Sequence, residues 1–121
     1  MIPLTAFAVR RPTWLRGEGG IDSRLLRVSD GRQCCLGQYL TACGVPHDAL
    51  AEVSSPGEVA GPDVPAWLLN PDGRDSVLAE VLMEVNDDHE LSEVARESTL
   101  TARFAQAGIT VRFVGRRPRR P

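Results

Sequence analysis

Hydrophobic side chains recur every three or four residues in three segments of the chain, residues 36–43, 76–85 and 92–108. This spacing places them on one face of an α-helix, so each segment is predicted to be an amphipathic helix that packs on a core. Ser92 is a suitable N-cap for the last of them, because its hydroxyl can accept a hydrogen bond from the first turn. A shorter helical turn is expected over residues 46–53, which begin with a proline.

Short apolar runs predict strands between and around these helices. Residues 4–10 and 109–114 are predicted strands near the two ends of the chain. Residues 24–28 predict a third strand, which pairs with residues 34–35 across the Ser-Asp-Gly turn at 29–31, because Asp-Gly between apolar runs is a strong hairpin signal. Together these patterns predict an α+β fold, in which a small, mostly antiparallel sheet packs with three to four helices.

The length of 121 residues fits one domain. We expect residues 1–115 to form a single α+β domain. Residues 116–121 contain four arginines and two prolines, and we expect them to form a disordered basic tail. A domain of this size leaves much of its surface exposed, so self-association into a homo-oligomer is also expected.

The charge and hydropathy of the chain bear on its partners and its compartment. A net charge of −2 argues against a dedicated duplex nucleic-acid-binding domain, which needs a concentrated basic face. No apolar run approaches the roughly 20 residues of a membrane-spanning helix, and the first residues do not have the pattern of a secretion signal. We therefore expect a cytoplasmic protein with no membrane partner.

The three cysteines do not indicate a disulfide framework. Cys34 and Cys35 are adjacent and would point to opposite faces of an extended chain, which disfavours a bridge between them. A zinc site made from these two with Cys43 and His47 is also disfavoured, because structural zinc ligands usually come in pairs two to four residues apart. Buried, reduced cysteines in a reducing cytoplasm are the expectation.

The densest polar cluster occupies residues 86–90, between two predicted helices. One interpretation is metal-assisted hydrolysis, in which Asp87 and Asp88 hold a hard cation and His89 moves protons. A second is hydrogen bonding from Asn86, Asp87 and Asp88 to a polar ligand. The third is that these are turn and capping residues with no chemical role.

No other motif indicates catalysis. Neither histidine accompanies a serine or cysteine nucleophile signature, and no phosphate loop or dinucleotide fingerprint is present. We therefore expect a binding protein rather than an enzyme, with no cofactor and no metal site.

All fourteen positive side chains are arginines. Arg16, which lies close to Trp14, and Arg24 suit phosphate binding and stacking on a base. Arg96 and Arg103 lie on the last predicted helix and have the same capacity. The alternative for any one of them is an ordinary solvated surface residue.

Three distant segments could enclose a nucleotide-sized ligand. They are the glycine-rich loop that carries Trp14 and Arg16, the long proline-rich loop that carries Trp67, and the polar junction at Asn86. A different use of Trp67 is also open, since its loop could dock on a protein partner and make this chain an accessory factor with no small ligand.

Several motifs, taken in order, resemble a family of small phage and prophage proteins, the Thoeris anti-defence sponges. The motifs are Trp14-Leu15-Arg16-Gly17, Ser23-Arg24-Leu25-Leu26, Cys34-Cys35-Leu36-Gly37, Asn86-Asp87-Asp88, and Phe104 with Gly108-Ile109-Thr110-Val111. They span most of the chain. One departure is Gln38, which stands where an aromatic residue is expected.

The resemblance implies a sponge that sequesters cyclic ADP-ribose-type immune signals without cleaving them. It also implies a homo-oligomer, a dimer or hexamer, with ligand pockets at subunit interfaces and separate sites for cyclic oligonucleotides. Asn86 and Asp88 would bind ribose hydroxyls, and Arg24 and Arg103 would bind phosphate or stack on adenine. Asn86 and Arg103 are expected at exposed or interface positions.

Overall fold

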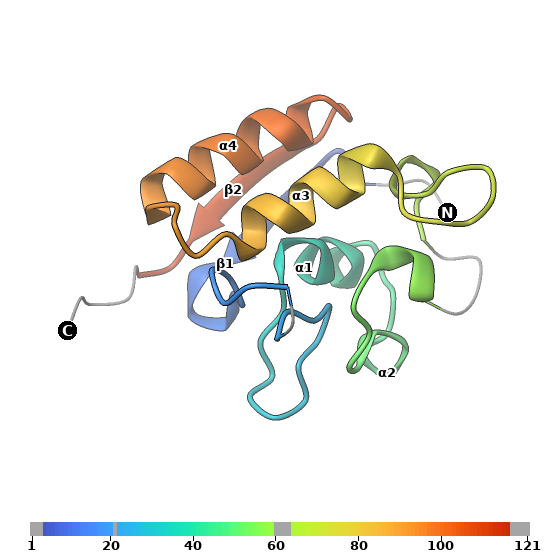
Figure 1. The fold of residues 1–121 in the computed structure, drawn as a ribbon, viewed down its shortest axis with the longest axis horizontal. Coiled ribbons are helices and arrows are strands. Elements are labelled where there is room, and N and C mark those ends of the chain that lie inside the picture. Colours follow the sequence, from blue (N-terminus) through green and yellow to red (C-terminus); the bar gives the residue numbers. More distant parts are fainter. Residues whose placement is uncertain (1–3, 21, 60–63, 117–121) are drawn as a thin grey trace.

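The computed structural model describes residues 4–20, 22–59 and 64–116. In these ranges, two short strands precede and follow the main helices (Figure 1). The elements are β1 (Ala6–Arg10), the 3₁₀ turn η1 (Arg11–Thr13), α1 (Cys35–Ala42), α2 (His47–Leu50), the 3₁₀ turns η2 (Pro56–Glu58) and η3 (Ala66–Leu68), α3 (Val77–Asp87), α4 (Glu93–Ala105) and β2 (Thr110–Val114). The three helices predicted from hydrophobic spacing are confirmed as α1, α3 and α4.

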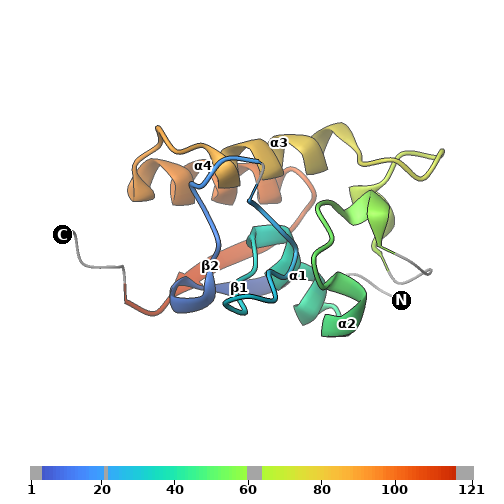
Figure 2. The same cartoon turned by 60° about the horizontal axis from the view of Figure 1, so that its bottom comes forward.

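Two layers enclose the hydrophobic core. Helices α3 and α4 lie side by side, and α4 also packs on β2. The opposite layer consists of the sheet and α1, which packs on both β1 and α3. Figures 1 and 2 both show the α3–α4 pair lying across this second layer.

Serine side chains set the starts of the two long helices. Ser76 accepts a hydrogen bond from the Ala79 amide at 3.1 Å, and Ser92 accepts one from the Ala95 amide at 3.1 Å. The N-cap prediction for Ser92 is therefore confirmed. Helix α3 continues past its predicted end to Asp87, so Asn86 is a helical residue that faces the core.

The prediction of a mostly antiparallel sheet is wrong. The sheet has two strands, and β1 and β2 run parallel, in a register that pairs Ala6 with Thr110 and Arg10 with Val114. Parallel neighbours cannot be joined by a tight turn, because the chain must return to the same end of the sheet before the second strand starts. Here the return includes α1, α3 and α4.

The hairpin predicted across residues 29–31 is also absent from the described residues. Only Arg27 and Arg32 form an antiparallel bridge there, around a turn in which Gly31 has a φ of +71°. The Leu25 amide donates instead to the carbonyl of Val53, and Cys35 already begins α1. The Cys34 amide does donate across the turn to the Arg24 carbonyl at 3.1 Å, but Leu25 and Leu26 bond to residues 52 and 53, so no regular strand pair forms among the described residues.

An aromatic cluster fills the centre of the core. The centre of the Phe7 ring lies 5.0 Å from the centre of the Tyr39 ring and 5.1 Å from that of Phe104, and both contacts are edge-to-face. Trp67 packs edge-on against Tyr39 with 5.4 Å between the ring centres, and its indole N–H donates to the Tyr39 hydroxyl at 3.1 Å. Edge-to-face contacts of this kind stabilise a core beyond the burial of area alone. Trp67 thus fixes its long loop to the core.

Helix α1 approaches the backbone of Leu25 too closely for any residue but glycine at one position. A Cβ built on Gly37 would lie 1.9 Å from the Leu25 carbonyl oxygen. This contact seats α1 against the preceding loop. It gives a packing reason for the glycine in the Cys-Cys-Leu-Gly motif.

The described elements share one hydrophobic core. The predicted tail, residues 116–121, lies outside the described residues except for Arg116. In the part of the chain that the structure describes, none of the helices has the length and apolar character needed to cross a membrane.

Candidate functional site

Two of the predicted ligand residues, Trp14 and Asn86, meet inside the core. The Trp14 indole N–H donates to Asn86 Oδ1 at 2.7 Å, and the backbone N–H of Cys35 donates to the same oxygen at 3.0 Å. Asn86 Nδ2 donates to the Leu15 carbonyl at 2.9 Å and to Asp87 Oδ1 at 2.9 Å. Both Trp14 and Asn86 are fully buried, so the expectation of an exposed or interface position for Asn86 is wrong. The carboxamide is used within the fold.

Arg16 lies next to Trp14, and its side chain is also held by partners within the fold. Its guanidinium lies 4.6 Å from the centre of the Trp14 ring and forms a two-bonded ion pair with Glu93. Burial raises the pKa of the Glu93 carboxyl, but Arg16 and Arg96 together outweigh this effect, and the net pKa is lowered. Arg16 therefore ties the glycine-rich loop to the start of α4.

The two other predicted arginines lie apart from this junction. Arg24 donates to the Ser23 carbonyl at 2.7 Å and lies 3.9 Å from the Glu52 carboxylate. Arg103 is in the last turn of α4 and is half-buried. Neither lines either of the two cavities described below.

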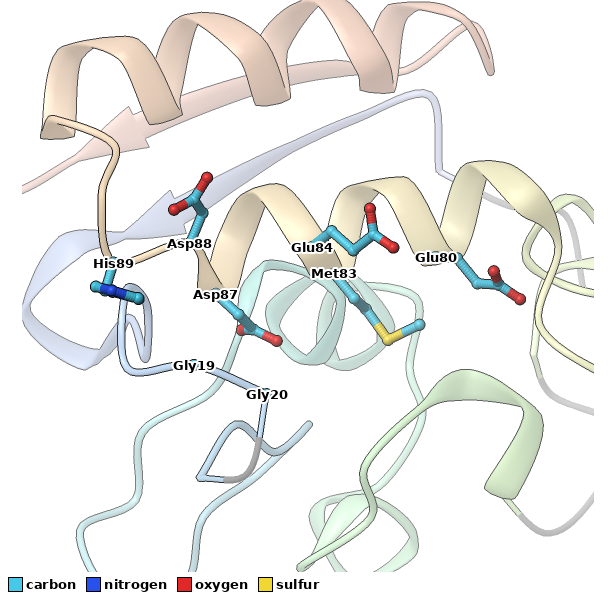
Figure 3. A pocket seen from close by; sticks show the side chains of 8 residues that line it. All are labelled: Gly19, Gly20, Glu80, Met83, Glu84, Asp87, Asp88 and His89. Carbon is cyan, nitrogen blue, oxygen red and sulfur yellow. The ribbon is translucent and has the colours of Figure 1, made fainter.

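Asp87 and Asp88 line a cavity between α3 and the Gly19–Gly20 segment (Figure 3). We call this cavity, of about 500 Å³, the acidic groove. Its lining residues are Gly19, Gly20, Glu80, Met83, Glu84, Asp87, Asp88 and His89. Figure 3 shows the Asp87 side chain on the side of Gly19 and Gly20, whereas Asp88 points away from them. The two aspartates do not converge on one point.

The acidic groove has a negative electrostatic character. Burial raises the pKa of the Asp87 carboxyl, although bonds from Asn86 and Ser23 and the charge of Arg96 act in the opposite direction. Among the described residues, four carboxylates line the groove and no arginine does. In the described residues, no three histidine, cysteine, aspartate or glutamate side chains come together as metal ligands. A phosphate in this groove would be repelled.

A second cavity, of about 380 Å³, lies between β1 and α1. We call it the arginine pocket. It is lined by Ala8, Arg10, Thr13, Gly31, Gln33, Gln38, Thr41, Ala42 and His47. In the part of the chain that the structure describes, this lining contains a guanidinium, two carboxamides, two hydroxyls and an imidazole, with no carboxylate. Its volume lies within the range of about 300–1,000 Å³ that is usual for small-molecule sites.

Comparison with protein-family models, with curated proteins and with solved structures finds no match for this chain. The functional assignment therefore depends on the chemistry of the two cavities.

Gln38 fixes the backbone that carries Arg10. Its Oε1 accepts from the Arg10 amide at 2.7 Å, and its Nε2 donates to the Arg10 carbonyl at 3.2 Å. The side-chain amide thereby occupies the hydrogen-bonding edge of β1, as a neighbouring strand would. The Arg10 side chain is exposed at the pocket, and within the described residues no carboxylate pairs with it.

Arg112 places a second positive charge on the same face of the sheet. In the parallel register it pairs with Ala8, which precedes Arg10 by two residues, so all three side chains project from one face. Arg112 is exposed and, in the described part of the chain, has no ion pair. The two arginines therefore repel each other in the absence of an anion.

Gln33 forms the inner part of the pocket and is only 8% exposed. Its Nε2 donates to the Gly37 carbonyl at 3.1 Å and to Thr41 Oγ1 at 2.8 Å. Sequence reasoning did not select Gln33, Thr41 or Arg10. The signal was the three-residue spacing of Gln38 and Thr41, which puts both on one polar stripe of α1.

The cysteines and the second tryptophan play no part in either cavity. Cys34 and Cys35 are buried free thiols, as predicted, and burial raises the pKa of the Cys34 thiol to about 12. Trp67 packs on Tyr39, and Trp14 packs on Phe113 at 5.1 Å. The two tryptophans thus contribute to different clusters and do not enclose a common site.

Proposed function

We propose that the protein is a binding protein, not an enzyme, and that it holds a phosphate-bearing ligand of the nucleotide class in the arginine pocket. The observation that carries this proposal is the exposed Arg10, whose described neighbours in that pocket are all neutral or basic. An arginine fork can donate two parallel hydrogen bonds to a phosphate. Arg112, on the same face of the sheet, adds a second positive charge.

The acidic groove is the weaker candidate for such a ligand. Its lining places Glu80, Glu84, Asp87 and Asp88 where the ligand would lie, and like charges in a half-buried site repel strongly. The arginine pocket therefore takes the place of Trp14, Arg16 and Asn86 as the site of ligand contact in this proposal.

Retention of the ligand without cleavage is supported by the composition of the same pocket. General-base catalysis needs a positioned base, and metal-assisted hydrolysis needs a set of metal ligands. The pocket contains His47, and none of its described lining residues is a carboxylate that could orient the imidazole. The hydrolase alternative at Asp87 and Asp88 is disfavoured because these side chains point in different directions (Figure 3).

The resemblance to the phage and prophage sponges supplies the identity of the ligand within this proposal. A cyclic nucleotide immune signal of the cyclic ADP-ribose type, or a cyclic oligonucleotide, would be sequestered intact. In this anti-defence role a phage-type protein would act in the host bacterial cytoplasm as a homo-oligomer, a dimer or hexamer, without a cofactor.

The first test is a thermal-shift screen of the full chain against cyclic ADP-ribose isomers and cyclic di- and trinucleotides. Ligand at a hundredfold excess over its dissociation constant should add about 2.7 kcal/mol of apparent stability. Arg10→Ala should abolish the shift. Arg74→Ala, which changes an exposed arginine outside both cavities, is the matched control and should leave the shift unchanged.

The ligand released by heating is then analysed by chromatography. Intact ligand is expected, and recovery of a cut product would overturn sequestration in favour of an enzyme. If none of the nucleotides shifts the melting temperature, the result favours the alternative that this chain is an accessory factor. A search for a protein partner then follows.

A further inference from the structure

The inner wall of the arginine pocket is held rigidly from several directions. The backbone N–H of Gln33 donates to the Thr13 carbonyl at 2.9 Å, and the Gln33 carbonyl accepts from the Leu15 amide at 2.8 Å. These bonds tie Gln33 to the segment that follows β1. Its side chain is tied to α1 by the two bonds from Nε2 to Gly37 and Thr41.

These bonds determine whether the remaining polar atoms of Gln33 and Thr41 can donate or accept a hydrogen bond. Both N–H groups of the Gln33 carboxamide are used, so only its Oε1 is left, and an amide oxygen can only accept. Within the described residues, no group donates to this oxygen. Thr41 Oγ1 already accepts from Gln33, so the Thr41 hydroxyl is free to donate its hydrogen elsewhere.

We propose that Gln33 and Thr41 recognise a neutral edge of the ligand that carries a hydrogen-bond donor beside an acceptor, as the edge of a nucleobase does. This inference rests on the proposed function, because it assigns the two ends of one ligand. The base lies inside the pocket against Gln33 and Thr41, and the phosphate lies at the exposed Arg10. Among the described residues, Gln33 Oε1 is not a fully buried unpaired atom, so it is open to the pocket. A ligand that fills the pocket without offering a donor would separate this oxygen from water and is therefore disfavoured.

The test uses three compounds that separate the two ends: adenosine 5′-monophosphate, ribose 5-phosphate without the base, and adenosine without the phosphate. Affinities are measured by NMR titration of the isotope-labelled full chain. The wild-type protein should bind adenosine 5′-monophosphate about tenfold more tightly than ribose 5-phosphate, which corresponds to about one net hydrogen bond. The Gln33 side-chain resonances should shift with the two adenine compounds only.

Thr41→Val and Thr41→Ser are the decisive variants. Thr41→Val keeps the shape but removes the hydroxyl, so its affinity for adenosine 5′-monophosphate should fall toward that for ribose 5-phosphate, with only the bond to Gln33 Oε1 left to the base. Thr41→Ser keeps the hydroxyl and should restore the preference. Circular dichroism melting of both variants confirms that the fold is intact. If Thr41→Val does not fold, the Gln33 resonances and the three wild-type affinities still decide the question.

The outcomes distinguish the two proposals. Equal wild-type binding of adenosine 5′-monophosphate and ribose 5-phosphate overturns base recognition and leaves phosphate binding in place. Equal binding of adenosine and adenosine 5′-monophosphate supports base recognition and overturns the role of Arg10. If none of the three compounds binds, both proposals fail.

Discussion

A buried carboxamide stabilises a fold only when its donors and acceptors all have hydrogen-bond partners. Each buried group without a partner destabilises the fold by its full desolvation cost. Asn86 meets this condition through bonds with the Trp14 indole, the Cys35 amide, the Leu15 carbonyl and the Asp87 carboxylate. One side chain thereby joins α3, the start of α1 and the glycine-rich loop.

Replacing Asn86 with alanine should therefore destabilise the protein. The change leaves the Trp14 and Cys35 N–H groups without an acceptor in the core, and we expect a loss of about 2–4 kcal/mol in the free energy of unfolding. Urea denaturation followed by tryptophan fluorescence measures it. The surface control Arg74→Ala, at an exposed arginine, should stay within about 0.5 kcal/mol of the wild type. A stable Asn86→Ala variant that had lost ligand binding would restore Asn86 to the ligand site.

At the scale of single residues, the sequence indicated which side chains lie close together but not what those side chains do. Trp14 and Asn86 were predicted to share a site, and they do meet, yet they bond to each other instead of facing a cavity. The number of donors and acceptors that surround a residue depends on distant segments. No local pattern could therefore show that the asparagine was fully satisfied inside the core.

At the scale of elements, the seating of α1 depends on a single missing side chain. Gly37→Ala would place a Cβ 1.9 Å from the Leu25 carbonyl oxygen, so the helix or the loop must move. We expect the free energy of unfolding to fall by about 3 kcal/mol, at the upper end of the range for overpacking. Thermal and urea denaturation measure the loss.

Gly20→Ala is the matched control for this change, because no heavy atom lies within 4 Å of a Cβ built there. Its stability should remain close to that of the wild type. Equal stability of Gly37→Ala and Gly20→Ala would contradict the proposed packing reason for the Cys-Cys-Leu-Gly motif.

Helices were predicted well and strand pairing poorly, for a physical reason. The helical period is a local property, and the serine caps lie next to the helices that they start. Strand pairing is a property of distant segments, and here β1 pairs with β2 across the main helices of the chain. The Asp-Gly turn formed with only one bridge around it, because Leu25 pairs with Val53 instead.

At the scale of the whole molecule, charge is distributed unevenly around a chain of net charge −2. Carboxylates gather at the acidic groove, and Arg10 and Arg112 lie on one face of the sheet. An overall charge cannot reveal this separation, so the sequence could exclude a strongly basic protein but could not locate an anion site.

Arg112→Ala should weaken binding of a phosphate-bearing ligand without changing the fold. Arg112 is exposed and acts through its charge, so we expect a loss of roughly three- to tenfold at low salt, which shrinks as salt is added. Calorimetric titration at two salt concentrations measures both effects. Arg74→Ala removes a charge from an exposed turn elsewhere and should alter neither the affinity nor its dependence on salt. A loss that does not depend on salt would contradict the electrostatic role.

The pairing of β1 with β2 also bears on when the proposed ligand site can form as the chain leaves the ribosome. Ala8 and Arg10 of the arginine pocket lie on β1, whose only partner strand in the described residues is β2. Because β2 follows α1, α3 and α4 in the chain, a nascent chain exposes an unpaired β1 while those helices are synthesised. Ligand binding should therefore appear late and all at once, when β2 has emerged.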